Sequence, residues 1–187
     1  MRELSIRELK REDLPKVKEF TDTEIGSGYY TLEELDDVFA RSQTNATMCS
    51  FVLADDPHGT IKGVRLSYPP GQWAKGKGKG LHPELWKTPV ESVAYFQSLF
   101  LSDDLRGRGW GRKLAEASLV ALKSAGAKAV VCHAWRESPQ DSSRRYLWKL
   151  GFQTVAIHPK YWSQVDYVCP LCGKPCMCTA EEMIKYL

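Results

Sequence analysis

A glycine-rich turn with basic side chains is the segment of this chain best suited to binding an anion. Residues 106–111 read RGRGWG, and the surrounding pattern predicts a strand over 93–101 before them and a helix from about 109. The first N–H groups of a helix lack partners within the helix, and the helix dipole adds positive charge there. Because glycine has no Cβ, the backbone can approach a phosphate closely. The turn therefore predicts a ligand that carries a pyrophosphate.

Two other phosphate motifs fit this chain poorly. A dinucleotide-binding turn needs a third glycine where this chain has Arg112, and the segment does not lie in a first strand–helix–strand unit. Residues 71–77, GQWAKGK, match the first seven positions of a P-loop, but Gly78 stands where Ser or Thr would hold magnesium. Neither a nicotinamide dinucleotide nor a P-loop nucleotide is therefore the expected ligand.

The pattern that remains is R-x-x-G-x-G between a strand and a helix, with Arg106, Gly109 and Gly111 at the fixed positions. It resembles the acetyl-CoA signature of the GNAT superfamily of N-acetyltransferases. Residues 146–152, YLWKLGF, resemble a later motif of the same family. The resemblance covers residues 1–165 and implies that the chain transfers an acetyl group from acetyl-CoA to a primary amine. The alternative is a helix start whose glycines only permit close packing.

The resemblance also implies where the coenzyme lies. It places the pantetheine arm along the strand expected at 93–101 and the pyrophosphate on the amides of the glycine turn. Gln140 falls near a family asparagine that contacts the pantetheine. The residues assigned to the coenzyme in this way are Leu99, Phe100, Leu101, Arg106, Gly107, Arg108, Gly109, Trp110, Gly111, Arg112 and Gln140.

The catalytic base of the family has no counterpart in this sequence. The period of a strand puts Tyr95, Gln97, Leu99 and Leu101 on one face, and the family glutamate aligns with Tyr95. Glu91 has the same parity but lies too far toward the start of the strand. The amine must lose a proton before it attacks, so we expect a water relay near Tyr95 instead of a direct carboxylate base.

The catalytic acid also departs from the family pattern. The family tyrosine that protonates the departing thiolate aligns with Leu147, and Tyr146 stands one residue earlier. One residue on a helix is a rotation of about 100°. Tyr146 is therefore a candidate acid, and the alternative is that Tyr146 only packs in the core.

Cys132 and His133 are adjacent on a strand, so they point to opposite faces and do not form a nucleophile–base pair.

Four of the six cysteines lie within ten residues, 169–178, which read CPLCGKPCMC. The C-P-x-C-G turn looks like half of a zinc knuckle, and the C-x-C that follows can complete a tetrahedral site. Free thiols and an iron–sulfur cluster are the alternatives. After them, Thr179 and Glu182 match a capping box, which predicts a short helix to residue 187. The candidate ligands of a structural zinc are Cys169, Cys172, Cys176 and Cys178.

The order of the expected elements predicts an α/β (α+β) fold. This is a GNAT-like mixed, mostly antiparallel sheet of about seven strands, with helices on both faces. The long segment 69–89 is either a solvated insertion or an acceptor-side lid that carries Lys75, Lys77 and Lys79. We expect an acetyltransferase domain over 1–165 and a cysteine-rich tail with a short helix over 166–187. The strands are expected over 4–9, 48–54, 61–68, 93–101, 127–135, 152–157 and 161–168, and the helices start near 13, 31, 109 and 141.

Composition narrows the class of protein. The chain has 187 residues, 43% of them hydrophobic, and a formal net charge of +3, which is too small to favour nucleic acid. It has no apolar run long enough to span a membrane and no signal-peptide pattern. We expect a cytoplasmic protein with reduced thiols, and a homodimer is left open. The alternative function is a coenzyme A-binding regulatory or interaction module with little or no turnover.

Overall fold

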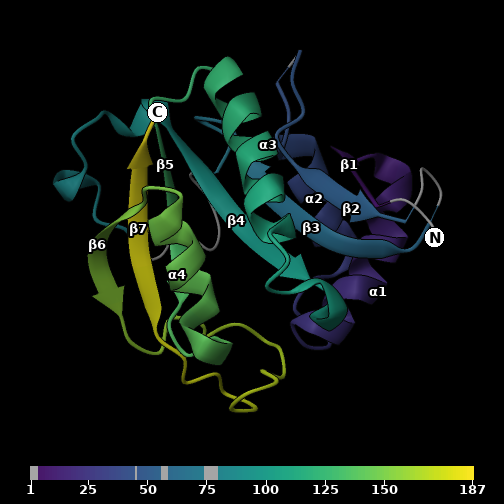
Figure 1. The fold of residues 1–187 in the computed structure, drawn as a ribbon. Helices are drawn as coiled ribbons and strands as arrows, with labels where there is room; N and C mark the ends of the chain where they lie inside the picture. The colour runs from purple at the N-terminus through teal and green to yellow at the C-terminus, as the bar shows by residue number, and fades with distance from the viewer. Residues whose placement is uncertain (1–3, 45, 56–58, 74–79) are drawn as a thin grey trace.

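A twisted seven-stranded sheet organises the molecule (Figure 1). The computed structural model describes residues 4–44, 46–55, 59–73 and 80–187. The strand order is β1-β2-β3-β4-β5-β7-β6, and every neighbouring pair is antiparallel except β4 and β5. The predicted mixed, mostly antiparallel sheet is therefore confirmed. The strands are β1 (Ser5–Glu8), β2 (Phe51–Ala54), β3 (Ile61–Tyr68), β4 (Val93–Leu101), β5 (Ala129–Trp135), β6 (Gln153–His158) and β7 (Ala180–Tyr186).

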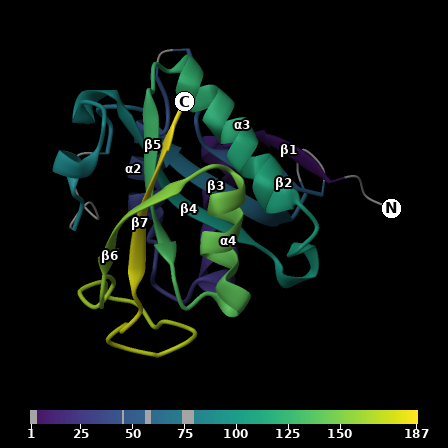
Figure 2. The ribbon, with the colours of Figure 1, turned by 60° about the vertical axis from the view of Figure 1, so that its left-hand side comes forward.

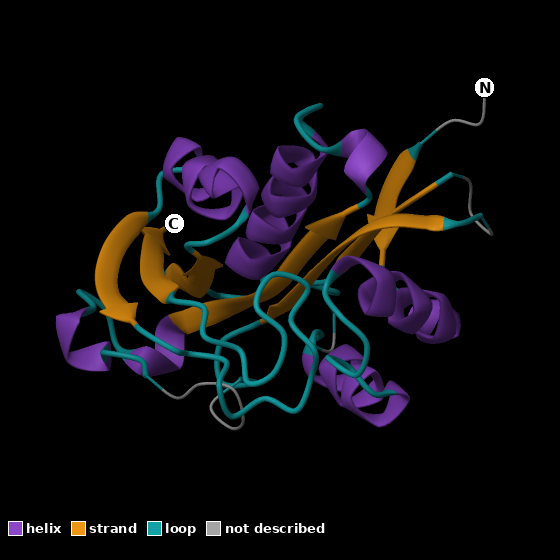
Figure 3. Ribbon diagram, turned by 90° about the horizontal axis from the view of Figure 1, so that it is seen from below, coloured by secondary structure: helices purple, strands orange, loops and turns teal. Residues whose placement is uncertain are grey.

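Helices cover both faces of this sheet, as Figure 3 shows. The helices α1 (Leu14–Glu24) and α2 (Leu32–Arg41) pack on one face, and α3 (Trp110–Ser124) and α4 (Ser142–Lys149) pack on the other. Thr31 and Glu34 cap α2 reciprocally, as predicted. Within the described ranges, no helix is long and apolar enough to cross a bilayer. Short 3-10 turns are Arg11–Asp13, Pro83–Leu85, Val90–Ser92, Asp103–Leu105 and Pro139–Asp141.

The parallel pair β4 and β5 separates halfway along its length. Ladder partners run from the pair Val93 and Ala129 to the pair Phe96 and Cys132. Beyond them β4 continues to Leu101 and β5 to residue 135, and Figure 1 shows β4 running diagonally away from β5. We call this opening between residues 97–101 and 133–135 the splay. Strand β7 occupies the other edge of β5, so the splay lies inside the sheet.

The C-terminal segment is a strand, so the predicted helix up to residue 187 is wrong. Residues 180–186 form β7, which lies between β5 and β6 (Figure 2). Helix propensity is a weak local preference, and here two flanking strands satisfy the backbone of the segment instead. Met183 and Ile184 are buried in the core. The strand predicted over 161–168 is also wrong, because that stretch forms turns.

The cysteine segment is therefore the connection between two strands of one sheet. Residues 159–179 leave the end of β6 and return to the start of β7. We propose that they form an insertion within a single domain, instead of a separate tail that begins at residue 166. The long segment before β4 also contains structure, since it holds the turns Pro83–Leu85 and Val90–Ser92. Lys75, Lys77 and Lys79, which were expected there as a lid, lie outside the described residues.

Candidate functional site

The glycine turn brings the first amides of α3 to the end of β4. Gly107 and Gly109 have φ angles of 73° and 83°, a left-handed conformation that side chains disfavour. Gly109 is the N-cap residue of α3, and a Cβ on either glycine would meet no atom within 4 Å. A Cβ on Gly111 would instead lie 3.4 Å from the side chains of Leu99 and Leu101. The first two glycines are therefore required by the left-handed backbone of the turn, whereas Gly111 lets the helix pack on the strand.

Arg106, the first residue of the motif, points away from the helix start. Its guanidinium lies 2.6 Å from Glu24 of α1 and 2.6 Å from Asp103, and its Nε donates to the carbonyl of Leu101 at 3.2 Å. Arg106 therefore ties the glycine turn to α1. Burial raises the pKa of Glu24, and the charge of Arg106 opposes this shift.

A β-bulge in β4 changes which side chains share a face. Leu66 pairs with Ser98, but the next residue of β3, Ser67, pairs with Phe96, so Gln97 is the extra residue. An inserted residue reverses the alternation of a strand. The expectation that residues 95, 97, 99 and 101 share one face is therefore wrong. Tyr95 and Phe100 pack with α1 and α2, whereas Leu99 and Leu101 pack on the α3 side.

Tyr146 binds a buried arginine near the point where β4 and β5 begin to diverge. Its hydroxyl accepts a hydrogen bond of 2.5 Å from Arg65, which lies on β3 on the far side of β4. Arg65 is only 2% exposed, and its guanidinium carbon lies 3.9 Å from the ring centroid of Phe96. Among the described residues, no carboxylate forms a salt bridge with Arg65, and its Nε has no hydrogen-bond partner. Leu147, at the aligned position, is a core residue.

On the opposite face, Tyr95 joins a polar pair with a histidine. The Tyr95 hydroxyl lies 2.8 Å from Nδ1 of His133, and the Tyr161 hydroxyl lies 3.3 Å from the same atom. Burial, with a contribution from the neighbouring His158, lowers the pKa of His133 to about 4. The imidazole is therefore neutral at neutral pH and accepts a hydrogen bond at Nδ1. Cys132 packs in the core on the other face, as the alternation predicted.

A buried carboxylate on β7 holds the long segment against this pair. Both oxygens of Glu182 are engaged: Oε1 accepts from the indole of Trp86 at 2.8 Å and from the amide of His82 at 3.1 Å. Oε2 lies 3.0 Å from the His82 ring and 2.9 Å from the His158 ring. Burial alone would raise the pKa of Glu182, but these bonds to the two histidines and Trp86 lower it. The carboxylate of Glu182 and the imidazoles of His82 and His158 lie close enough together to hold a metal. The hydrogen bonds just described already satisfy both oxygens of this carboxylate.

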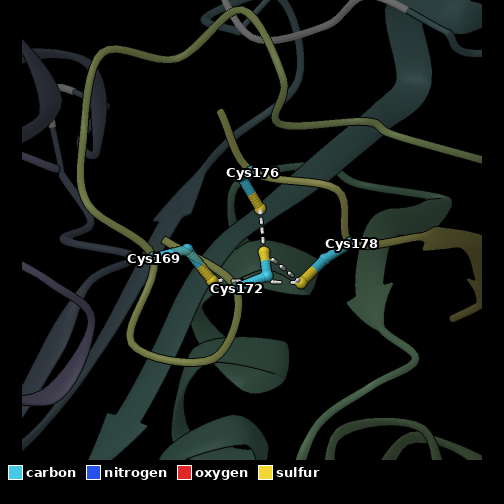
Figure 4. Close-up of side chains that lie close together, drawn as sticks. All are labelled: Cys169, Cys172, Cys176 and Cys178. Carbon is cyan, nitrogen blue, oxygen red and sulfur yellow. Dashed lines mark hydrogen bonds between the residues drawn. The ribbon is translucent and has the colours of Figure 1, made fainter. Parts of the chain in front are cut away.

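The four cysteines of the insertion converge on one point, as Figure 4 shows. The Sγ atoms of Cys172 and Cys178 are 3.6 Å apart, and the pairs 169–178 and 172–176 are both 3.9 Å apart. A tetrahedral zinc with Zn–S bonds of about 2.3 Å requires sulfur separations of roughly 3.8 Å. These distances are far longer than a disulfide, for which S–S is about 2.05 Å. The geometry therefore fits a tetrathiolate metal site.

Backbone groups support this arrangement of sulfurs. The amide of Met177 donates to the Sγ of Cys172 at 3.2 Å, and Cys169 and Gly173 exchange two backbone hydrogen bonds. Burial opposes ionisation of Cys169, but amides of the turn outweigh it and lower the pKa of this thiol to about 7. The Tyr167 hydroxyl donates to the Sγ of Cys176 at 3.1 Å. A thiolate ligand is stabilised by donors of this kind.

The remaining residues predicted to contact the coenzyme lie before α4 and at the start of α3. Gln140 is exposed and has a φ of 55°, in the turn before α4. Arg108, Trp110 and Arg112 stand at the start of α3, and Arg112 pairs with Glu116 at 2.7 Å. Sequence reasoning missed Arg65, the role of His133 and the Glu182 network. For Arg65 a signal existed, because it is a charged residue in an otherwise apolar strand centre (GVRLS).

The fold and the glycine turn match the arrangement that the sequence resemblance implies for an acyltransferase. A family model described as the acetyltransferase (GNAT) family matches residues 5–152. The chain belongs to this family, and its membership supports acyltransferase activity. No curated protein matches the chain.

Solved structures show the same fold at low sequence identity. Ard1 from Thermoplasma volcanium is 17% identical, with a TM-score of 0.67, and the match covers 98% of this chain and 97% of that one. The putative acetyltransferase yncA from Salmonella typhimurium, solved with its cofactor acetyl-CoA, is 16% identical, with a TM-score of 0.67 and coverages of 99% and 94%. The ribosomal-protein-S18-alanine N-acetyltransferase from Escherichia coli is 16% identical, with a TM-score of 0.63 and coverages of 98% and 94%.

Proposed function

We propose that the chain is an N-acetyltransferase that moves the acetyl group of acetyl-CoA to a primary amine by direct attack in a ternary complex. The observation that carries the proposal is the splay, which opens within the sheet and ends at the glycine turn. Within it, the edge of β4 beyond Phe96 has no ladder partner in β5 among the described residues. That edge offers backbone groups to the amides of a pantetheine arm, in the manner of an added strand.

The start of α3 supports the placement of the pyrophosphate. Gly107 and Gly109 have left-handed conformations, and no atom lies within 4 Å of the place where a Cβ of either would stand. Helix N-terminal amides and the helix dipole favour an anion there. We propose that the backbone of Leu99, Phe100 and Leu101 runs along the pantetheine, and that the amides of 107–112 receive the pyrophosphate. Arg106 acts in this proposal by holding the turn, since its side chain is bound to Glu24 and Asp103.

Tyr146 is the proposed acid for the departing thiolate. Arginine has only donors, so the Tyr146 oxygen must accept from Arg65, and the phenolic hydrogen is free to point elsewhere. Burial raises the pKa of Tyr146 and Arg65 opposes the shift, so the phenol keeps its proton at neutral pH. As the amine nitrogen bonds to the carbonyl carbon and the C–S bond breaks, Tyr146 donates its proton to sulfur. The buried guanidinium then stabilises the negative charge that remains.

Tyr95 is proposed to orient the amine on the other face. His133 is neutral, so its Nδ1 accepts the hydroxyl hydrogen of Tyr95. The Tyr95 oxygen also interacts with the Tyr161 hydroxyl, and we propose that a lone pair of this oxygen accepts from an N–H of the amine. Burial keeps Tyr95 protonated by raising its pKa well above the ordinary value. Neither group is a strong base, so the amine enters in its neutral form. The one proton that nitrogen sheds as the amide forms leaves through water, and the amide product keeps the other N–H.

We also propose that Cys169, Cys172, Cys176 and Cys178 hold one structural zinc. Three of these side chains are buried, and the sulfur separations match a tetrahedron. Four thiolates fill every coordination position, so the metal has no open site for water or substrate. Its role is to fix the path of residues 159–179.

Coenzyme A release in the presence of an amine panel tests the proposed function. Free thiol is measured with acetyl-CoA alone and after addition of each amine, and the acetylated amine is identified by mass. Amine-dependent release, equal to the acetylated product, is expected. Acetyl-CoA that binds without any amine-dependent release across the panel would instead indicate the coenzyme-binding module.

A further inference from the structure

An apolar cavity of about 70 Å³ lies at the open end of the splay. Phe100 of β4 and Trp135 of β5 line it from the two diverging strands. Tyr29, from the connection between α1 and α2, lines it on the face where Tyr95 and Phe100 pack. The cavity is therefore on the face opposite to Tyr146 and Arg65, where we placed protonation of the leaving thiolate.

The remaining wall belongs to the cysteine insertion. Trp162, Tyr167, Cys169 and Pro170 all line the cavity. Two of these residues are tied to the proposed metal site directly: Cys169 supplies a sulfur, and Tyr167 donates to the Sγ of Cys176 at 3.1 Å. The wall and the sulfur cluster are thus parts of one structure, so the position of this wall depends on the cluster.

The chemistry of the cavity favours an apolar occupant. Its lining is mostly aromatic and aliphatic, and its one acidic member, Glu24, is already paired with Arg106 at 2.6 Å. An acceptor carboxylate would lie against Glu24, and an ammonium would lose water without gaining a free counter-charge. A branched aliphatic or small aromatic side chain gains by burial there. An apolar surrounding also disfavours the charged form of a nearby amine, which helps to supply the neutral nucleophile.

We infer that this cavity binds the apolar side chain of the amine acceptor, and that the cysteine cluster sets the affinity by fixing its wall. The substrate class is then a primary amine with an apolar group on its α-carbon. The identification of the occupant as the amine acceptor rests on the proposed function. The part assigned to the cysteine cluster rests on the proposed metal site.

Binding without turnover tests the cavity independently of the reaction. The protein is titrated with leucinamide, lysinamide and glycinamide, and binding is followed by tryptophan fluorescence, because Trp135 and Trp162 line the cavity. Coenzyme A is present throughout, and it has no acetyl group to transfer. We expect leucinamide to bind at least about tenfold more tightly than glycinamide, and lysinamide to gain no such advantage. Ile25 also lines the cavity, so Ile25→Phe, which fills it, should remove the preference. Trp162→Leu, which enlarges the cavity, should shift the preference to phenylalaninamide. Val120→Ala, on the exposed face of α3, is the control.

The metal arm uses the same titration with Cys172→Ser and Tyr167→Phe. Both should reduce the leucinamide preference, while the affinity for coenzyme A stays within about twofold. Equal binding of leucinamide and glycinamide by the native protein would overturn the cavity assignment. An unchanged preference for leucinamide in both variants would overturn the claim that the cysteine cluster fixes the wall of the cavity. Selective binding of leucinamide without coenzyme A release from acetyl-CoA would uphold the cavity and refute the proposed function.

Discussion

The two faces of the splay are assembled in different ways. The proposed coenzyme side is local in sequence: β4, the glycine turn and the start of α3 lie within residues 93–112. The proposed acceptor side joins residues that are far apart, since Glu182 binds His82 and Trp86, and Tyr29 and Cys169 line one cavity. A local arrangement leaves a short motif in the sequence, whereas an assembled one depends on the fold. This difference predicts that the coenzyme side tolerates damage to the acceptor side.

The largest expected effect is loss of coenzyme binding in Gly109→Asp. This substitution puts a side chain on a residue with a φ of 83° and a negative charge at the N-terminus of α3. We expect acetyl-CoA affinity, measured by calorimetry, to fall by more than about a hundredfold. The matched control is Gly126→Asp, which has a φ of 90° and open space at the other end of α3. Similar acetyl-CoA affinities for the two variants would show that the pyrophosphate does not bind at this turn.

The next effect concerns the acid. Tyr146→Phe should lower kcat by about a hundredfold or more, the lower range for general acid catalysis, with unchanged coenzyme affinity. Arg65→Met keeps the approximate length of the side chain but removes the charge and the bond to the hydroxyl, so kcat should fall by roughly tenfold and the alkaline limb of the pH profile should move to higher pH. If kcat in Tyr146→Phe stays within about threefold of the native value, Tyr146 is a packed core residue.

Metal removal should loosen the insertion and leave the sheet folded. Elemental analysis of protein purified under reducing conditions should give about one zinc per chain. Chelation should increase hydrogen exchange in residues 159–179, whereas β7 stays protected because it is paired on both edges. Metal well below one equivalent, together with four titratable thiols in the native insertion, would contradict the zinc site. Loss of protection in β7 would contradict its independence from the metal.

A smaller effect is the pH dependence that His133 contributes to stability. Its pKa is about 4 in the folded protein against an ordinary value of 6.5, so the unfolded chain takes up the proton first as the pH falls. The stability is complete above about pH 6.5 and is lost on acidification toward pH 4, by roughly 2 kcal/mol between about pH 7.5 and about pH 5. The free energy of unfolding of the native protein and of His133→Gln is measured with urea across this pH range. It should fall less steeply with acidification in the variant. Parallel curves would mean that His133 is not the group responsible.

The sequence predicted the parts of the molecule whose signals are local. The sheet, its helices on both faces and the turn that starts α3 follow from periodicity, glycine positions and capping residues such as Thr31 and Glu34. The cysteine spacing correctly singled out four sulfurs that the structure brings within 4.8 Å of one another. Whether they bind zinc, and whether the predicted site residues act as assigned, stays a prediction.

The parts that could not be predicted depend on contacts between distant segments. The segment at 180–186 has helix-forming residues and a helix cap pattern, yet two neighbouring strands override them and Glu182 serves His82, His158 and Trp86. The bulge at Gln97 depends on pairing with β3, so the period of β4 alone gave the wrong face for Tyr95. The partnership of Arg65 and Tyr146 spans 81 positions and leaves no spacing pattern.

The most direct test of the contrast between the two sides is a calorimetric titration of acetyl-CoA into the protein before and after metal removal. If the coenzyme side is built from residues 93–112 alone, the two dissociation constants should agree within about twofold, although leucinamide binding weakens. The metal-free sample must keep its protected β7 for the comparison to apply. A loss of coenzyme affinity greater than about tenfold in such a sample would contradict the account, because the insertion would then be part of the coenzyme site.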